Sequence, residues 1–156
     1  MTRCVYIASS EWQVSKSAIA LGVLELFARQ VRSVGFFRPL VQSLKEDGIT
    51  TALLATNTLR HQSFEDSVGV SYEDWANDPD AAIDTIVAKY SALAERFEAI
   101  VIVGSDFDDL TSGTELDHNA LIAANLNAPV LYVCRASDRS VDEVCRMAEE
   151  AIETFE

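Results

Sequence analysis

Residues 8–17 read A-S-S-E-W-Q-V-S-K-S, and the fold follows from what stands on either side of them. The apolar run Arg3–Ala8 before them is typical of a buried strand, and apolar residues at 20, 24, 27 and 31 predict a helix over 17–31. A loop that ends in Lys-Ser between a strand and a helix is the setting of a P-loop, in which backbone N–H groups, a lysine and a hydroxyl hold phosphate and magnesium. Lys16 and Ser17 occupy the two positions that this motif needs.

The glycines of a P-loop are missing from this stretch. Ser15 stands directly before the lysine, and the first glycine position falls on Ser10 or Ser9, depending on the spacing. A residue other than glycine costs roughly 1–2 kcal/mol in left-handed backbone, so a preformed phosphate cradle is weakened. We therefore expect Ser9, Ser10, Ser15, Lys16 and Ser17 to form an anion-binding, nucleotide-like loop that does not hydrolyse nucleotide. The competing interpretation is a plain helix start with a solvated lysine.

Three further apolar runs predict buried strands at Ser33–Phe37, Ala99–Val103 and Pro129–Cys134. Helical patterns lie at 78–97, from 114 or 115 to 126, and from 140 onward, and a shorter one lies at 49–56 before an irregular stretch. Strands that alternate with helices predict an α/β fold with a three-layer, P-loop-like parallel sheet and right-handed crossovers.

Two helix starts carry clear capping signals. Asp78 followed by Pro79 is a typical first turn, and Ser140 with Glu143 has the spacing of a capping box. For the last helix we predict a buried stripe of Val141, Val144, Ala148, Ile152 and Phe155. A βαβ architecture normally returns through another strand after such a helix. Residues 1–156 are therefore expected to be a single domain, truncated before the last strand, from a longer chain.

The charge of the chain is unevenly distributed. Its 156 residues carry 12 basic and 25 acidic side chains, a net charge of −13, which disfavours nucleic acid and anionic membranes as partners. Residues 1–60 hold 7 basic and 4 acidic side chains, whereas residues 61–156 hold 5 and 21. A site for an anion is therefore expected in the first part. Between Glu65 and Asp74, acidic residues flank Val68, Val70 and Tyr72, and we expect a solvated connection there.

Other residue types give little sign of chemistry. Cys4, Cys134 and Cys145 form no C-x-x-C pair and fit reduced thiols, and the apolar run at the N-terminus is too short for a signal peptide, so a cytoplasmic location is expected. His61 and His118 have no partner at ligand spacing, so no metal site is predicted. We assign no catalytic residue and no cofactor, and a nucleotide or metabolite effector stays open.

Three stretches, I-V-I-V-G-S-D-F-D-D (100–109), T-E-L-D-H-N-A-L-I-A-A-N-L-N-A-P-V-L-Y-V (114–133) and G-F-F-R-P-L (35–40), carry a family resemblance. The chain resembles, from Val5 to about residue 145, the N-terminal domain of long-form phosphate acetyltransferases, which is similar to dethiobiotin synthetase. This resemblance implies the strand order 33–37, 99–103, 3–8, 129–134. It implies too that a separate C-terminal domain converts acetyl-CoA and phosphate to acetyl phosphate and CoA. It also implies that the N-terminal domain is regulatory, contributing to oligomer stability and metabolite sensing. The expected partners are that catalytic domain, further subunits of a homo-oligomer and a small anionic metabolite.

Several polar residues are expected around the same crevice as the loop. Asp106, with Asp108 and Asp109, follows a strand where nucleotide enzymes keep a magnesium ligand, but a solvated acidic loop is the alternative. Arg38 follows another strand and either meets an anion or makes a surface ion pair. Glu115 and Asn119 either face the crevice or belong to an ordinary helix start.

The sequence leaves three functions open. The leading hypothesis is a non-catalytic regulatory and assembly domain of phosphate acetyltransferase. The rivals are an ATP-dependent enzyme of the dethiobiotin synthetase type and a non-catalytic adaptor with a vestigial P-loop. The missing loop glycines favour the first over the second.

Overall fold

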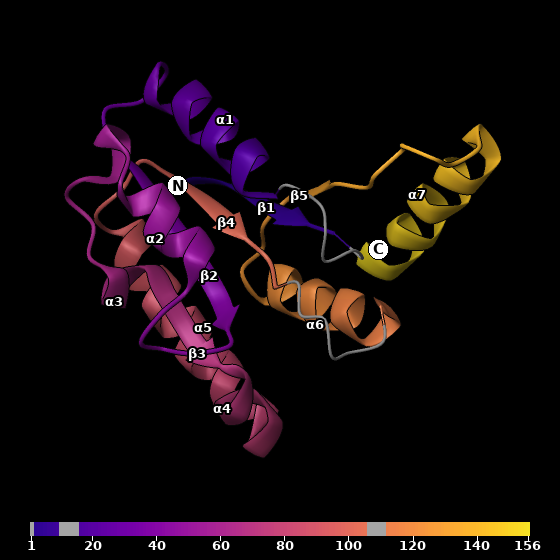
Figure 1. The fold of residues 1–156 in the computed structure, drawn as a ribbon. Helices are drawn as coiled ribbons and strands as arrows, with labels where there is room; N and C mark the ends of the chain where they lie inside the picture. The colour runs from indigo at the N-terminus through magenta and orange to yellow at the C-terminus, as the bar shows by residue number, and fades with distance from the viewer. Residues whose placement is uncertain (1, 10–15, 106–111) are drawn as a thin grey trace.

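The computed structural model describes residues 2–9, 16–105 and 112–156, with only the backbone of residues 112–114. Within these residues a parallel sheet of five strands forms the centre of the molecule, in the order β3-β2-β4-β1-β5 (Figure 1). The strands are β1 (Arg3–Ala8), β2 (Val34–Val41), β3 (Val68–Ser71), β4 (Ala99–Val103) and β5 (Val130–Tyr132). The predicted order of four strands is confirmed, and β3 is added outside β2.

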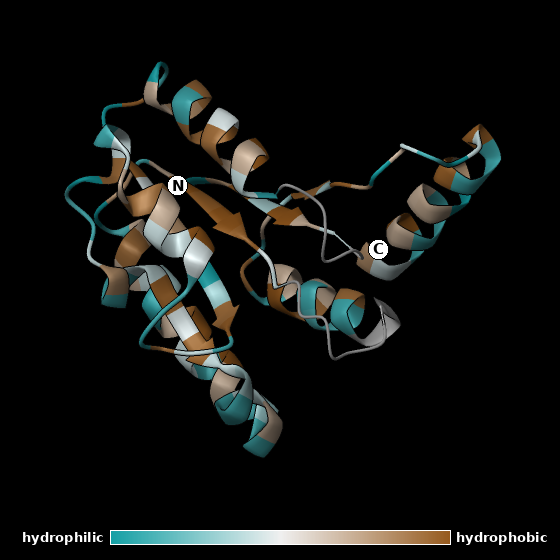
Figure 2. Cartoon of the chain, viewed as in Figure 1, coloured by the Kyte–Doolittle hydropathy of each residue, from teal (hydrophilic) through white to brown (hydrophobic). Residues whose placement is uncertain are grey.

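Helices cover both faces of the sheet, as the α/β prediction requires (Figures 1 and 2). They are α1 (Lys16–Ala28), α2 (Gly48–Leu54), α3 (Phe64–Ser67), α4 (Tyr72–Asn77), α5 (Pro79–Ala94), α6 (Ser112–Asn125) and α7 (Val141–Phe155), with a 3₁₀ helix η1 (Asn57–Leu59). The side chains of β4 alternate between two cores: Val101 and Val103 pack with α1 and α2, whereas Ile100 and Ile102 pack with α5 and α6. A strand buried on both faces is typical of a parallel sheet between two helical layers.

The predicted helix starts are confirmed. The Asp78 carboxylate accepts a hydrogen bond from the N–H of Ala81, and Pro79 is the first residue of α5. Ser140 and Glu143 form a reciprocal capping box at the start of α7. These side chains satisfy backbone donors that have no partner inside the helix.

The prediction of a solvated connection around Val68 and Val70 is wrong. These residues belong to β3, where they are only 2% and 4% exposed. The Lys89 ammonium donates to the carbonyls of Val68 and Gly69 at 2.9 and 3.0 Å. A side chain at Gly69 would place its Cβ 2.1 Å from the Pro39 carbonyl oxygen, so only glycine fits there. This strand was not predicted because it has only four residues and lies between two short helices with acidic first turns.

The predicted buried stripe on the last helix is also wrong in part. Val141 and Ile152 are 78% and 57% exposed, and among the stripe and its neighbours only Ala151 is buried. The helix packs along α6 and β5, but β5 is a short edge strand in which Leu131 is itself 40% exposed. The strand therefore covers only one side of the apolar face of α7.

Candidate functional site

A buried cluster of polar side chains, which we call the crevice, lies at the carboxyl ends of β1, β2 and β4, where Gly104 and Ser105 follow β4. Lys16 is the first residue of α1, and its side chain crosses to this point. Its ammonium donates to the carbonyl oxygens of Ser105 at 2.8 Å and Gly104 at 3.3 Å. The residue is only 1% exposed. The predicted phosphate-binding lysine is therefore held by protein carbonyl groups.

A second buried cation meets the same carbonyl. Arg38 lies in β2, and its Nη1 donates to the Gly104 oxygen at 3.0 Å. Its Nε donates to Asp47 Oδ1 at 3.1 Å. Asp47 also accepts hydrogen bonds from the backbone N–H and the hydroxyl of Thr50, at 2.8 and 2.7 Å, and so caps α2. Arg38 thus faces the crevice and makes an ion pair, in which Arg38 is buried and Asp47 is partly buried.

Asn119 connects the strand end to α6. Its Oδ1 accepts hydrogen bonds from the Tyr6 hydroxyl at 2.7 Å and the Ser105 N–H at 3.0 Å. Its Nδ2 donates to the Glu115 carbonyl at 2.8 Å. A Cβ at Gly104 would lie 2.2 Å from Asn119 Oδ1, so this contact requires glycine. Burial raises the pKa of the Tyr6 phenol, and the nearby Arg38 charge opposes that rise.

Glu115 lies one turn before Asn119 on α6 and is 4% exposed. It accepts a hydrogen bond from the Tyr72 hydroxyl. Burial and the hydrogen bond to Glu115 raise the pKa of the Tyr72 phenol. The second carboxylate oxygen, Oε1, is buried without a hydrogen-bond partner. The His118 ring packs against the rings of Trp75 and Tyr72, with centroid distances of 5.1 and 6.4 Å.

The structure brings together four of the predicted site residues, Lys16, Arg38, Glu115 and Asn119, around Gly104 and Ser105. Ser9 is buried at the end of β1, and Ser17 is half-buried in the first turn of α1. The predicted residues Ser10, Ser15, Asp106, Asp108 and Asp109 lie outside the described residues.

Sequence reasoning missed four members of the crevice: Tyr6, Asp47, Tyr72 and Ser105. Asp47 had a usable signal, because an aspartate directly before the run G-I-T-T is a typical helix N-cap. The other three are recruited by contacts between elements far apart in the chain, and no local pattern marks them.

Among the residues that the structure describes, the positive and negative charges of the crevice balance. Two cations, Lys16 and Arg38, are accompanied by the carboxylates of Asp47 and Glu115, and the carbonyl groups supply further acceptors. An anion that enters must compete with the Gly104 and Ser105 carbonyls for the Lys16 ammonium. Among the described residues, no group of three or more His, Cys, Asp or Glu side chains is arranged to hold a metal ion.

Comparison with known families agrees with this geometry. A family model described as an AAA domain matches residues 3–153, nearly the whole chain. The chain belongs to this AAA-domain family. Its sheet, with β4 between β1 and β2, and the Lys-Ser pair at the start of α1 give the AAA-domain chain a P-loop NTPase-like fold.

Curated relatives of the AAA-domain chain are phosphate acetyltransferases. The protein of that name from Synechocystis sp. is 29% identical over 164 residues, and the one from Nitratidesulfovibrio vulgaris is 30% identical over 165 residues. In both cases the match covers 100% of this chain and 23% of the relative, in the N-terminal part. The chain thus spans about a quarter of the length of these relatives and resembles their N-terminal domain.

A solved structure supports the fold of the AAA-domain chain. The BceF tyrosine kinase domain superposes with a TM-score of 0.57 at 14% identity, covering 98% of this chain and 63% of that domain. At this identity the likeness concerns the fold alone. Among the helices of the described residues, none combines the length and apolar character needed to cross a bilayer.

Proposed function

We propose that this AAA-domain chain is the N-terminal regulatory and assembly domain of a cytoplasmic phosphate acetyltransferase and carries out no nucleotide hydrolysis of its own. Its relatives of that name are matched over their N-terminal part. In the proposed protein a C-terminal domain forms acetyl phosphate and CoA from acetyl-CoA and phosphate. That domain and further copies of this chain are the proposed partners.

One observation supports the non-catalytic role above the others: the Lys16 ammonium is buried on the carbonyl oxygens of Gly104 and Ser105. A P-loop lysine that acts on nucleotide must reach the terminal phosphates. Here ATP would have to displace two protein acceptors and also bind a loop whose glycine positions are serines. Both costs oppose tight nucleotide binding.

The effector that we propose for this site is a small anion such as phosphate. It would bind at the N-terminus of α1 through backbone N–H groups, Lys16 and Ser17, with Arg38 assisting. The helix dipole favours an anion there by roughly 0.3–1 kcal/mol. Because the lysine must first leave its carbonyl partners, we expect weak binding that falls further as salt concentration rises.

The regulatory role can be tested on the complete product of the reading frame that contains these residues. Acetyl phosphate formation from acetyl-CoA and phosphate should be found in that product and be absent from residues 1–156 alone. Removing residues 1–156 should leave the reaction intact but change its response to small anionic metabolites or its subunit number. Activity in the isolated chain, or a truncated product that is indistinguishable in both respects, would rule out the role.

A further inference from the structure

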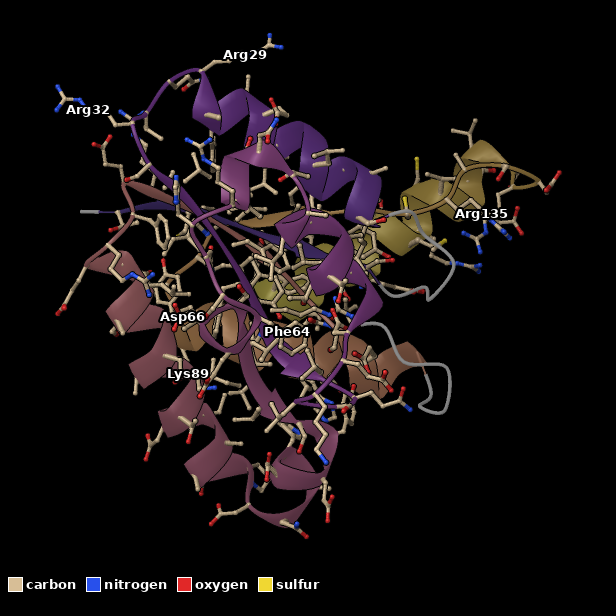
Figure 3. All side chains as sticks on the ribbon, turned by 60° about the vertical axis from the view of Figure 1, so that its left-hand side comes forward. Arg29, Arg32, Phe64, Asp66, Lys89 and Arg135 are labelled. Carbon is tan, nitrogen blue, oxygen red and sulfur yellow. The ribbon has the colours of Figure 1, made fainter. Side chains whose placement is uncertain are left out.

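The amino-terminal edge of the sheet gathers half of the basic residues that lie outside the crevice. Five arginines, which we call the arginine edge, stand there: Arg3, Arg29, Arg32, Arg60 and Arg96. Arg3 begins β1, Arg32 precedes β2 and Arg96 precedes β4, and the starts of parallel strands share one edge. Arg29 and Arg32 extend outward from this end of the molecule (Figure 3). Arg3, Arg29 and Arg32 make no ion pair with any side chain that the structure describes.

Two adjoining cavities form a groove along this edge. One, of 310 Å³, has an apolar floor that includes Val31, Leu59 and Phe97, with Arg32 and His61 at its rim. The other, of 590 Å³, is bordered by Arg3, Arg96 and the carboxylates of Glu95 and Glu98. Val31, Ser33 and Phe97 line both, so the two cavities lie side by side. We call this depression the edge groove.

The floor of the edge groove is built into the sheet. Phe97 packs against Gly35 of β2 so closely that a Cβ on Gly35 would lie 2.6 Å from the Phe97 ring. The Arg96 guanidinium lies over the same ring, 5.4 Å from its centroid. The Glu98 carboxylate is occupied by the backbone N–H of Arg32. The groove therefore combines a fixed apolar floor with Arg3 and Arg32, which make no ion pair with a described side chain, whereas the Arg96 guanidinium is paired with the Asp66 carboxylate at 2.8 Å.

The outer face of α7 has the complementary character. Val141, Cys145 and Ile152 fall within about 40° of one another around the helix axis, at 100° per residue, and all three are exposed. Beside this strip runs a second one of carboxylates, from Asp142, Glu149, Glu153 and Glu156. α7 is thus an acidic amphipathic helix with a single apolar face, which is covered on the side of Ala151 and uncovered at Val141, Cys145 and Ile152.

We propose that the outer face of α7 docks into the edge groove of a second copy of this chain. The apolar strip would lie on the floor around Phe97, and the carboxylates would meet the arginine edge, as an amphipathic helix binds a groove. Within one molecule α7 and the arginine edge lie at opposite ends (Figures 1 and 3). One chain cannot pair its own two surfaces, but a head-to-tail row of copies can.

This contact gives the assembly part of the proposed function a location and rests on that part. The contact joins two different surfaces and is therefore heterologous. In a row of copies, the groove of one terminal copy and the α7 face of the other stay free, so further copies can add. Assembly is then not limited to a dimer. It should also weaken as salt concentration rises, because exposed arginines and carboxylates supply much of the attraction.

A mixing experiment tests the proposal by sedimentation velocity, with reducing agent present because Cys145 is exposed. The groove variant carries Arg29→Glu and Arg32→Glu, and the helix variant carries Val141→Arg and Ile152→Arg. We expect the native chain to self-associate beyond a dimer at low salt and each variant alone to be monomeric. Mixed one to one, the variants should form a dimer and nothing larger. The intact α7 of the groove variant can dock into the intact groove of the helix variant, and no other intact pair of surfaces remains.

A matched control compares Arg32→Glu with Lys45→Glu, which makes the same charge change at an exposed site after β2. Only Arg32→Glu should weaken association, by about tenfold or more. Circular dichroism checks that all variants are folded. A native chain that stays monomeric, a groove variant that still self-associates through α7, or a mixture that remains monomeric would each overturn the proposal. This experiment measures self-association alone. It can therefore fail while the catalytic and regulatory tests of the proposed function succeed, and it can succeed while those tests fail.

Discussion

Lys16 and Ser105 are 89 residues apart in the chain, yet the ammonium of the first donates to the carbonyl oxygen of the second at 2.8 Å. The contact ties the start of α1 to the end of β4 and occupies the lysine that would otherwise reach phosphate. The crevice thus resembles a P-loop in its elements and differs from one in the partner of its lysine. This single contact links the stability of the fold to our proposal that the chain hydrolyses no nucleotide.

Lys16→Ala should lower the free energy of unfolding by roughly 1–3 kcal/mol, because the Gly104 and Ser105 carbonyls lose a buried donor. Urea denaturation measures this change. Lys45→Ala, at an exposed position, is the control and should stay within about 0.5 kcal/mol of the native chain. An unchanged or higher midpoint for Lys16→Ala would mean that the lysine does not hold the strand end.

Tyr6 and Asn119 should prove energetically coupled. Tyr6→Phe removes one hydrogen bond and should cost about 1 kcal/mol, whereas Asn119→Ala also leaves the Ser105 N–H unpaired and should cost roughly 2–3 kcal/mol. The double variant should cost less than the two single changes together. Asn125→Ala, which removes an exposed hydrogen bond to the Leu121 carbonyl, serves as the control. Strictly additive losses at Tyr6 and Asn119 would argue against a shared network.

Two glycines should respond in opposite ways to alanine. Gly104→Ala places a Cβ 2.2 Å from Asn119 Oδ1 and must displace that side chain from Tyr6 and Ser105, so it should destabilise by about 2 kcal/mol or more. Gly22 lies in α1 with nothing within 4 Å of the added Cβ, and alanine there should stabilise by up to about 1 kcal/mol. Thermal melts of both variants give the comparison. A tolerated Gly104→Ala would contradict the close packing at this point.

The buried phenols predict how the chain unfolds in alkali. The pKa values of Tyr6 and Tyr72 are raised above the ordinary 10.0, chiefly by burial. Because the folded state then keeps protons that the unfolded state releases, this contribution to stability is complete below about pH 10 and decreases as pH rises above it. Phenolate absorbance should increase together with the loss of circular dichroism. Two phenols that titrate at ordinary pKa while the fold stays intact would show that they are not buried.

The sequence predicted the sheet well because its signals are local. The apolar runs around Val5, Val101 and Val130 mark strands, and the family resemblance implied their order. β3 was missed because four residues between acidic helix starts carry no periodicity. On α7 the apolar pattern was read correctly as a stripe, but whether a stripe is buried depends on what packs against it.

The sequence predicted only some of the crevice residues, because only those have a local signal. Arg38, Glu115 and Asn119 stand next to recognisable strand ends or helix starts, so they could be named from the sequence. Their partners Tyr6 and Tyr72 lie inside a strand and at the start of a short helix, and they enter the site through contacts of 113 and 43 residues in sequence separation. Long-range pairing of this kind leaves no mark in a single sequence.

Isothermal titration of the chain with ATP and magnesium tests the central claim most directly. With Lys16 held by Gly104 and Ser105, we expect ATP to give no heat of tight binding and no release of phosphate on prolonged incubation. Phosphate alone should bind weakly, and less at higher salt. A dissociation constant for ATP in the low micromolar range or tighter (about −7 to −8 kcal/mol), lost in a folded Lys16→Ala variant, would contradict the account and show that the P-loop is functional.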